Sequence, residues 1–393
     1  MDAALQHIAD QVRGASASGK ALRIRGGGSK DFYGRLLQVE ILDTRPLTGI
    51  TSYEPSELVV TVRAGTPLAE LEAALAEKGQ CLPFEPPHFS VGKTAGAVAT
   101  VGGMVAAGLS GPARASAGGV RDYMLGVQLL NGRAEHLTFG GQVMKNVAGY
   151  DVSRLMAGSM GTLGVITDVS LKVLPVAPAE ATLVFELDQT SALAQLHRWG
   201  AQPLPLNASC WVHDDTPPSG TAPVGAGGGR DMLFVRLRGA VAAVASACQK
   251  MLQAVPGTRM DNAVAGSDWQ ACRDLRLPFF AAPPANDMAL WRLSVAQTAP
   301  ALALPWPQLV EWHGGLRWLW APLSATNQIR DAAKQSRGFA SVFIANSSID
   351  TWANGSFDTY MPLDTSLDTI HRRLKAEFDP AGIFNRGRMY PDL

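Results

Sequence analysis

The sequence contains few cysteines, and their spacing limits the kinds of site that the chain can hold. Among 393 residues there are four, Cys81, Cys210, Cys248 and Cys272. No two of them form a C-x-x-C pair, the arrangement from which many iron–sulfur clusters and zinc sites are built, so we expect no metal site. A disulfide framework is not expected either in a chain of this length.

The sequence also lacks an excess of charge, a long apolar stretch and a signal peptide. Lys plus Arg and Asp plus Glu both number 34, which argues against a nucleic acid or an anionic membrane bound through bulk charge. No stretch approaches the ~20 apolar residues of a transmembrane helix. Residues 1–20 have the pattern of an amphipathic helix without the basic start of a signal peptide. We therefore expect a cytoplasmic protein.

Glycine and proline, in contrast, are abundant: the chain has 40 glycines and 25 prolines without the fixed period of collagen. Three consecutive glycines at 26–28 follow a short predicted strand at 21–25. Because glycine has no side chain, such a loop lets main-chain N–H groups converge on an anion, and Ser29 and Lys30 add polar donors. The loop fits a bound pyrophosphate, but a plain turn between a strand and a helix explains the glycines equally well.

A second glycine motif, S-V-G-K-T-A-G at 90–96, copies the end of a nucleotide-triphosphate P-loop. The first glycine of that motif falls on Pro87, and no buried strand precedes it, so we reject a P-loop. The motif overlaps a stretch dominated by Gly, Ala, Ser and Thr at 93–119. Two interpretations of this stretch stay open: a small-residue helix packed tightly against a neighbour, or a backbone track along an extended ligand.

The rest of the N-terminal half predicts alternating strands and helices. A strand at 58–62 is followed by a helix that Thr66 is placed to cap. Asn131 and Gly132 form the predicted turn of a β-hairpin. Residues 152–175 predict a helix, a glycine-rich turn and a strand.

The composition changes near residue 176, which we take as a domain boundary. Beyond it, predicted strands such as 232–239 and 316–323 alternate with helices, and 214–229 has the composition of a flexible surface loop. Six of the nine tryptophans fall between positions 269 and 320. We expect them to build a core or an interface rather than a stacking site.

Six sequence blocks together resemble a known family. They are R-G-G-G at 25–28, A-T-V-G-G at 99–103, S-G at 110–111, K-N-V-A-G-Y-D at 145–151, G-S-M-G-T-L-G-V-I at 158–166 and F-D-P-A-G-I-F-N at 378–385. In this order they resemble the flavoproteins of the vanillyl-alcohol oxidase and p-cresol methylhydroxylase family. Within it, the phrases at 82–89 and 143–168 are most similar to the FAD-binding E subunits of bacterial glycolate oxidase.

The resemblance implies an α+β fold and an FAD cofactor. A two-part FAD-binding domain of the vanillyl-alcohol oxidase type would occupy 1–175, with 346–393 returning to it, and an antiparallel α+β cap domain would occupy 176–345. The implied cofactor-binding residues are Arg25, Gly26, Gly27, Gly28, Ser29, Lys30, Pro87, Thr100, Gly102, Gly103, Ser110, Gly111, Gly158, Ser159, Gly161, Thr162, Gly164, Val165, Ile166 and Asn385.

The sequence departs from the family pattern in three places. Ser29 and Lys30 stand where covalent members carry a histidine just past the glycine loop, so the resemblance implies noncovalent FAD. Met160 replaces the glutamate of many relatives and removes one polar group near the cofactor path. The cap half also lacks the H-x-G-D-G-N-x-H block of the family's catalytic 2-hydroxy-acid dehydrogenases.

The missing block bears on the chemistry, because oxidation of a 2-hydroxy acid needs a base for the hydroxyl proton and a cation for the carboxylate. His88 and His313 are the available bases, but we expect His88 to lie along the FAD and His313 to be a surface residue at the end of a strand. Arg236 and Arg317 are the available cations, although each sits in an alternating strand and is equally explained by facing solvent. We therefore assign no catalytic residue.

The resemblance implies the FAD-binding subunit of a glycolate (2-hydroxy acid) oxidase or dehydrogenase complex. The implied partners are a catalytic flavin subunit and an iron–sulfur subunit to which electrons pass, so the chain would be peripheral at the inner membrane through those subunits. No nucleic-acid partner is expected. Two alternatives stay open: a self-sufficient FAD-dependent alcohol or hydroxy-acid dehydrogenase, and a structural subunit that holds FAD for folding or assembly.

Overall fold

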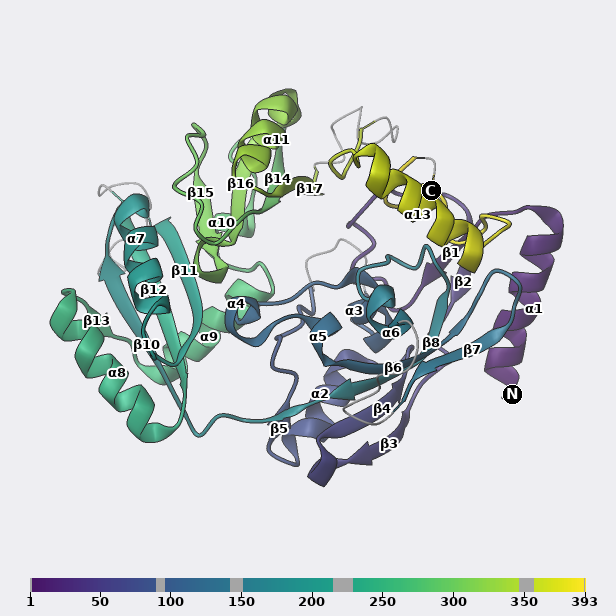
Figure 1. Cartoon of the computed structure of the whole chain (residues 1–393), viewed down its shortest axis with the longest axis horizontal. Coiled ribbons are helices and arrows are strands. Elements are labelled where there is room, and N and C mark those ends of the chain that lie inside the picture. The colour runs from purple at the N-terminus through teal and green to yellow at the C-terminus, as the bar shows by residue number, and fades with distance from the viewer. Residues whose placement is uncertain (1, 90–95, 142–150, 215–228, 346–356, 392) are drawn as a thin grey trace. The chain divides into compact units, whose positions relative to one another are not determined.

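A computed structural model describes residues 2–89, 96–141, 151–214, 229–345, 357–391 and 393. The chain divides into two compact units, which Figure 1 shows coloured along the sequence. Unit 1 comprises Met1–Ser110, Gly118–Val176 and Gly355–Leu393, and unit 2 comprises Gly111–Ala117 and Ala177–Asn354. Seven residues from the middle of the N-terminal half, Gly111–Ala117, therefore belong to unit 2.

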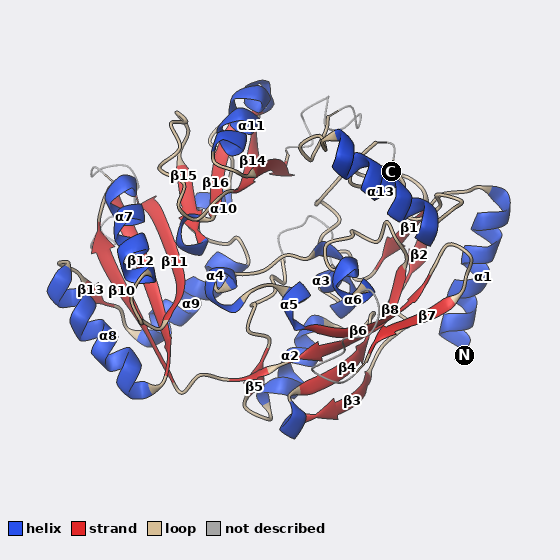
Figure 2. Cartoon of the chain, viewed as in Figure 1, coloured by secondary structure: helices blue, strands red, loops and turns tan. Residues whose placement is uncertain are grey.

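Unit 1 is built on a five-stranded antiparallel sheet (Figure 2). The strand order is β3 Ile50–Glu54, β4 Val59–Arg63, β8 Val165–Lys172, β6 Met124–Leu130 and β7 His136–Gly140. The central strand β8 is buried along most of its length, because it has a neighbour on each side and packs on both faces. The alternation of its side chains sends Val165 and Ile166 into two different cores.

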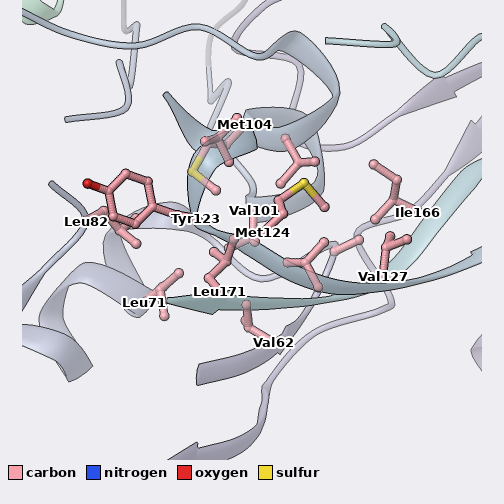
Figure 3. Close-up of a cluster of buried hydrophobic side chains, with 14 of the residues drawn as sticks. Val62, Leu71, Leu82, Val101, Met104, Tyr123, Met124, Val127, Ile166 and Leu171 are labelled. Atoms are coloured by element: carbon pink, nitrogen blue, oxygen red, sulfur yellow. The ribbon is translucent and has the colours of Figure 1, made fainter. Parts of the chain in front are cut away.

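The larger core lies between the sheet and four helices (Figure 3). These helices are α2 Leu68–Ala76, α3 Val101–Ala107, α5 Val120–Tyr123 and α6 Val152–Met156. Figure 3 shows Leu71 of α2 and Met104 of α3 close to Leu171 of β8. On the other face α1, Ala3–Ser18, packs its Leu5 and Ile8 against Val165, which confirms the amphipathic N-terminal helix.

The C-terminal tail returns to the start of unit 1. The parallel strands β1 Leu22–Arg25 and β2 Glu40–Asp43 form a small separate sheet. After the last helix, α13 Thr365–Phe378, the tail forms a parallel bridge from Phe384 to Leu22. A short pair, β5 Gln80–Cys81 with β9 Leu174–Pro175, and the single turn η1 Pro55–Glu57 complete the unit.

The predicted hairpin is confirmed, and the predicted helix cap is wrong. Asn131 Oδ1 accepts the backbone N–H groups of Arg133 and Glu135 between β6 and β7, at 3.0 and 2.9 Å. Helix α2 begins at Leu68 and has no side-chain cap. Thr66 is turned away from the helix, because its hydroxyl accepts the backbone N–H of Gly49 at 2.9 Å.

Unit 2 is built on an eight-stranded antiparallel sheet. Its order is β13 Thr258–Arg259, β10 Ala179–Glu186, β12 Arg230–Gly239, β11 Leu206–Asp214, β15 Gln308–Glu311, β16 Leu316–Pro322, β14 Met288–Ser294 and β17 Phe339–Ile344. The predicted strands at 232–239 and 316–323 are thereby confirmed. Of the predicted loop at 214–229, only the two end residues are described.

Helices cover both faces of this sheet. On one face α7 Gln189–Gly200 and α8 Val241–Ala254 pack onto β10 and β12. On the other, Trp269 of α9, Asn262–Arg273, donates to Thr182, and Phe280 of α10, Pro278–Ala281, packs edge-on against Trp318. Short helices α4 Arg114–Ala117, η2 Trp312–Gly314 and η3 Leu323–Ala325, and helix α11 Thr326–Gln335, fill the remaining connections.

Four of the five tryptophans that the sequence assigned to a core or an interface are core residues of unit 2, and the fifth, Trp306, is only half-buried. Trp291, Trp312, Trp318 and Trp320 are each no more than 6% exposed. Trp320 Nε1 donates to the backbone carbonyl of Phe279, so its polar atom is satisfied within the core. In the part of the chain that the structure describes, no helix has the length and apolar character needed to cross a membrane.

The core of unit 1 makes a stability prediction. Leu171 is fully buried on β8, so Leu171→Ala leaves a cavity that should lower the free energy of unfolding by about 2–5 kcal/mol. The control, Leu36→Ala, removes a side chain that is 62% exposed and should change it by less than about 0.5 kcal/mol. Urea denaturation followed by circular dichroism measures both; equal losses for the two variants would contradict this core.

Candidate functional site

Unit 1 contains a cleft beside the three consecutive glycines. Five segments line it: β1, the loop that follows β1, α3 with the residues just before it, the turn at Met160, and the C-terminal tail. The lining residues are Arg23, Ile24, Arg25, Gly26, Gly27, Gly28, Ser29, Lys30, Asp31, Val98, Thr100, Gly103, Ala106, Ala107, Met160, Asn385 and Arg388.

The cleft carries a net positive charge. Among its described lining residues are Arg23, Arg25, Lys30 and Arg388, against one carboxylate, that of Asp31. That carboxylate lies between two of the arginines, 2.7 Å from Arg23 Nη2 and 2.8 Å from Arg25 Nε. Burial lowers the pKa of Arg388 to about 10, which still leaves it charged at neutral pH. Such a surplus of guanidinium and ammonium groups suits a ligand with several anionic oxygens.

The glycines allow close packing within the chain at the wall of this cleft. A Cβ on Gly27 would overlap the carbonyl oxygen of Val98, and a Cβ on Gly26 would overlap the hydroxyl of Thr100. Gly28 has a φ of +79°, a conformation that residues with side chains rarely adopt. The approach of the Val98 backbone therefore explains the glycine at 27, the approach of the Thr100 side chain explains the glycine at 26, and both glycines line the cleft.

Asn385 holds two walls of the cleft together. Its Oδ1 accepts the backbone N–H of Ile24 at 2.8 Å, and its Nδ2 donates to the carbonyl of Met160 at 2.6 Å. Gly161 has no side chain at the point where this amide passes, because a Cβ there would lie 2.7 Å from Asn385 Nδ2. Asn385 lines the cleft, and its carboxamide positions the two segments on either side.

Two further buried cations fix the tail. Lys375 Nζ donates to the carbonyls of Thr162 and Phe384 and to the carboxylate of Asp379, each at 2.7 Å. The charge is thus fully hydrogen-bonded, as a buried ammonium requires. Arg388 donates to the backbone carbonyls of Lys30, Asp31, Tyr33 and Arg35, and so fixes the loop that follows the glycines.

The structure brings part of the predicted cofactor-binding set into this cleft. Arg25, Gly26, Gly27, Gly28, Ser29, Lys30, Thr100, Gly103 and Asn385 line it. Other members of the set lie behind its walls. Gly102 packs against Ala64, Gly164 packs against the carbonyl of Leu130, and Val165, Ile166 and Pro87 are buried. Their roles stay predictions.

Three more members of the predicted set line a second cavity of unit 1. Gly158, Ser159 and Thr162 face a volume of about 190 Å³ together with residues of α13 and the tail. Ser159 Oγ is buried and has no hydrogen-bond partner among the described residues. Ser110 ends one segment of unit 1, and Gly111 begins the short segment of unit 2, where its carbonyl accepts Trp312 Nε1 at 3.0 Å.

Two motifs of the sequence lie mostly outside the described residues. The K-N-V-A-G-Y-D block is described only at Asp151, whose side chain caps α6 by accepting the N–H of Arg154 at 3.1 Å. Of the rejected P-loop motif at 90–96, only Gly96 is described. The small-residue stretch that follows contains the helix α3, so the helical interpretation is correct for residues 101–107.

The two candidate bases lie in different units. His88 Nε2 is 2.7 Å from Glu72 Oε2 of α2, and His88 does not line the cleft. His313 lies in η2 of unit 2, with Nδ1 at 3.0 Å from Ser209 Oγ and Nε2 at 3.3 Å from Ser116 Oγ. Burial lowers the pKa of His313 to about 4, so its imidazole is neutral at pH 7.

The expectation that Arg236 and Arg317 face solvent is wrong. Arg236 is 2% exposed, donates to Asn207 Oδ1 at 2.7 Å and lies over the ring of Trp269. Arg317 is fully buried and donates to two backbone carbonyls. Helices cover both faces of the sheet, so alternation along a strand does not bring every second residue into water.

Sequence reasoning missed Arg23, Asp31 and Arg388 of the cleft. Arg388 follows the F-D-P-A-G-I-F-N block by three positions, and that proximity was its only signal. Arg23 and Asp31 flank the glycine loop, but neither belongs to a motif. Their role depends on the ion pairs that the folded loop makes, which spacing alone does not reveal.

Comparison with known proteins identifies the family and several relatives of this chain. Residues 3–140 match the FAD binding domain family. Over 388 residues the chain is 41% identical to the glycolate oxidase subunit GlcE of Escherichia coli, a match that covers 99% of this chain and 98% of that protein. Over 155 residues it is 28% identical to the glycolate oxidase subunit GlcD of Bacillus subtilis, covering 39% of this chain and 32% of that one.

The fold is shared with a solved structure. The structure of alkyldihydroxyacetonephosphate synthase matches with a TM-score of 0.63 at 16% identity, over 96% of this chain and 74% of that chain. Together the matches confirm the predicted family resemblance, the fold class and the FAD cofactor.

The glycine loop makes a prediction about cofactor binding. In Gly27→Ala the new methyl group overlaps Val98 and displaces the cleft wall, at a cost of about 1–3 kcal/mol. FAD affinity should fall roughly five- to hundredfold. The matched control is Gly14→Ala in α1, where a Cβ meets no atom within 4 Å. Fluorescence titration of the apoproteins with FAD compares them, and equal affinities would show that the loop does not shape the site.

Proposed function

The chain belongs to the family of the glycolate oxidase subunit GlcE, and from that premise we propose that it is the FAD-binding subunit of a complex that oxidises a small 2-hydroxy acid. The observation that carries the proposal is the cationic cleft of unit 1, most of whose lining residues belong to the segment that matches the FAD binding domain. In this proposal unit 1 is the FAD-binding domain and unit 2 is the cap.

The cleft suits the pyrophosphate of FAD. The backbone at 26–30 would supply N–H donors, and Arg25, Lys30 and Arg388 would supply positive charge. Ser159, which lines the second cavity and not this cleft, would contact another part of the cofactor, because its buried hydroxyl lacks a partner among the described residues. When bound, FAD supplies a two-electron acceptor for the hydride of an alcohol. The residues of this chain bind and orient that group.

We propose that the FAD is held noncovalently. Among the described residues that line the cleft there is no histidine, cysteine or tyrosine, and Ser29 and Lys30 follow the glycines. In the same proposal the partners are a catalytic flavin subunit and an iron–sulfur subunit that receives the electrons, and the chain is peripheral at the inner membrane through them. The sequence has no C-x-x-C pair, so another chain would hold the cluster.

The mode of attachment can be tested by denaturation. Precipitation of the purified yellow protein with acid should release all the flavin into the supernatant, because hydrogen bonds and ion pairs do not survive unfolding. Absorbance at the flavin maximum, measured in pellet and supernatant, decides the question. Flavin that stays with the pellet would overturn the noncovalent proposal.

The division of labour between subunits makes a kinetic prediction. The only candidate base of unit 2 that sequence reasoning named, His313, is held by Ser209 and Ser116. A missing base costs about 10²–10⁴ in rate, so glycolate should reduce the flavin of the isolated chain slowly or not at all, whereas the assembled complex reduces it during turnover. Stopped-flow absorbance with excess glycolate and D-lactate measures this. Bleaching within one turnover time of the complex would favour a self-sufficient dehydrogenase, and a flavin that never cycles in the complex would favour a structural role.

A further inference from the structure

Arg292 of β14 differs from the other arginines on the central strands of unit 2. Its guanidinium is half-buried, with Cζ at 5.2 Å from the ring centre of Trp312 and 5.9 Å from that of Trp318. The structure gives the side chain no hydrogen-bond acceptor and no carboxylate among the described residues. In the part of the chain that the structure describes, the N–H donors of this guanidinium therefore meet two indole rings and no acceptor.

The neighbouring arginines show that this is unusual. Arg236 donates to Asn207, Arg238 pairs with Glu180 at 2.5 Å, and Arg317 donates to backbone carbonyls. A half-buried guanidinium is normally satisfied in one of these ways, since leaving its donors unpaired costs free energy.

The nearby carboxylate of unit 2 is not available to Arg292. Glu311 of β15 is buried, and its two oxygens accept from Trp318 Nε1 at 2.7 Å and from Cys272 Sγ at 3.4 Å. Trp312 Nε1 donates to the carbonyl of Gly111, and Trp318 Nε1 donates to Glu311, so the polar atom of each indole is already hydrogen-bonded. They therefore offer Arg292 only ring faces, which hold a cation without neutralising it.

A second guanidinium meets the same ring. Arg114 of α4 lies with Cζ at 5.2 Å from the ring centre of Trp312. Arg114 belongs to Gly111–Ala117, the short segment of unit 2 that lies inside the match to the FAD binding domain. Arg114 thus follows Ser110 and Gly111 closely in the sequence, and these two residues belong to the predicted FAD-binding set.

The backbone at this place is strained. Trp312 and His313 both have a φ of +54°, in the left-handed region that residues with side chains seldom occupy. The strain is held by the hydrogen bond from His313 N to Ser209 Oγ at 3.0 Å and by the bond from Trp312 to Gly111. Two adjacent strained residues that present an indole to two guanidinium groups are typical of a functional site.

We propose that Arg292, with Arg114 on the same Trp312 ring, binds the carboxylate of a small organic acid of the 2-hydroxy or 2-oxo class. The guanidinium fork matches both oxygens of a carboxylate, and partial burial between indoles strengthens the pair. The identification of the acid rests on the proposed function; the binding of a carboxylate rests on the contacts of Arg292. In this proposal Arg292 has the role of carboxylate-binding cation, for which the sequence offered Arg236 and Arg317 as candidates.

The test is calorimetric titration of the purified, FAD-loaded full chain with oxalate and with glycolate, and with sulfate as an anion of different shape. We expect oxalate and glycolate to bind, and Arg292→Gln to weaken both about tenfold to a hundredfold. Arg292→Lys keeps the positive charge but cannot form two parallel hydrogen bonds to a carboxylate. Its affinity for both acids should lie between that of the unchanged protein and that of Arg292→Gln. The matched control is Arg238→Gln, an arginine of the same sheet whose partner is Glu180, which should bind as the unchanged protein does.

Several results would overturn the proposal: no heat with millimolar oxalate or glycolate in the unchanged protein, equal affinity in Arg292→Gln, or sulfate bound as tightly as oxalate. If Arg292→Gln fails to fold, Arg114→Gln and Arg292→Lys decide, and unchanged affinity in both overturns it. FAD content, read from the visible spectrum of each sample, separates the two proposals. A chain that binds oxalate through Arg292 without FAD contradicts the proposed function alone; a chain with FAD and no carboxylate binding contradicts this inference alone.

Discussion

The carboxamide of Asn385 joins β1 to the turn at Met160, and the form of the cleft depends on this tie. A buried amide needs hydrogen-bond partners, so the backbone groups of Ile24 and Met160 fix the position of Asn385 and, with it, the position of the tail. Lys375 adds a second tie, because its ammonium group is satisfied only when Thr162, Asp379 and Phe384 surround it. The cationic wall proposed to bind the FAD pyrophosphate therefore forms only when the N-terminal segment and the C-terminal tail are folded against each other.

Much of the fold was predictable because its signals are local. The hairpin at Asn131 needs only its turn residues and two alternating strands, and the glycines at 26–28 mark a turn wherever they occur. The cap of α2 was not predictable in the same way. Thr66 has the right residue type one position too early, and its hydroxyl bonds to Gly49, a residue 17 positions away. A competing tertiary contact overrode the local preference.

The site was predictable where a backbone motif makes it and not where side chains meet across the fold. The loop at 25–30 and Asn385 belong to motifs and were found. The alternation of side chains along a strand could not show which of Arg236, Arg292 and Arg317 is placed to bind a carboxylate, because the environment of each depends on which helix covers its strand. Arg236 meets Trp269 of α9, whereas Arg292 lies between two indoles without an acceptor. That difference is a property of packing, and only the structure shows it.

The account's central claim is that the cleft of unit 1 recognises the pyrophosphate of the cofactor. Calorimetric titration of the apoprotein with FAD, ADP and riboflavin tests it most directly. The account predicts that ADP binds measurably and competes with FAD, because it carries the two phosphates that the arginines and the glycine loop contact. Riboflavin, which has no phosphate, should bind far more weakly than either. Riboflavin bound as tightly as FAD, with no competition from ADP, would contradict the claim.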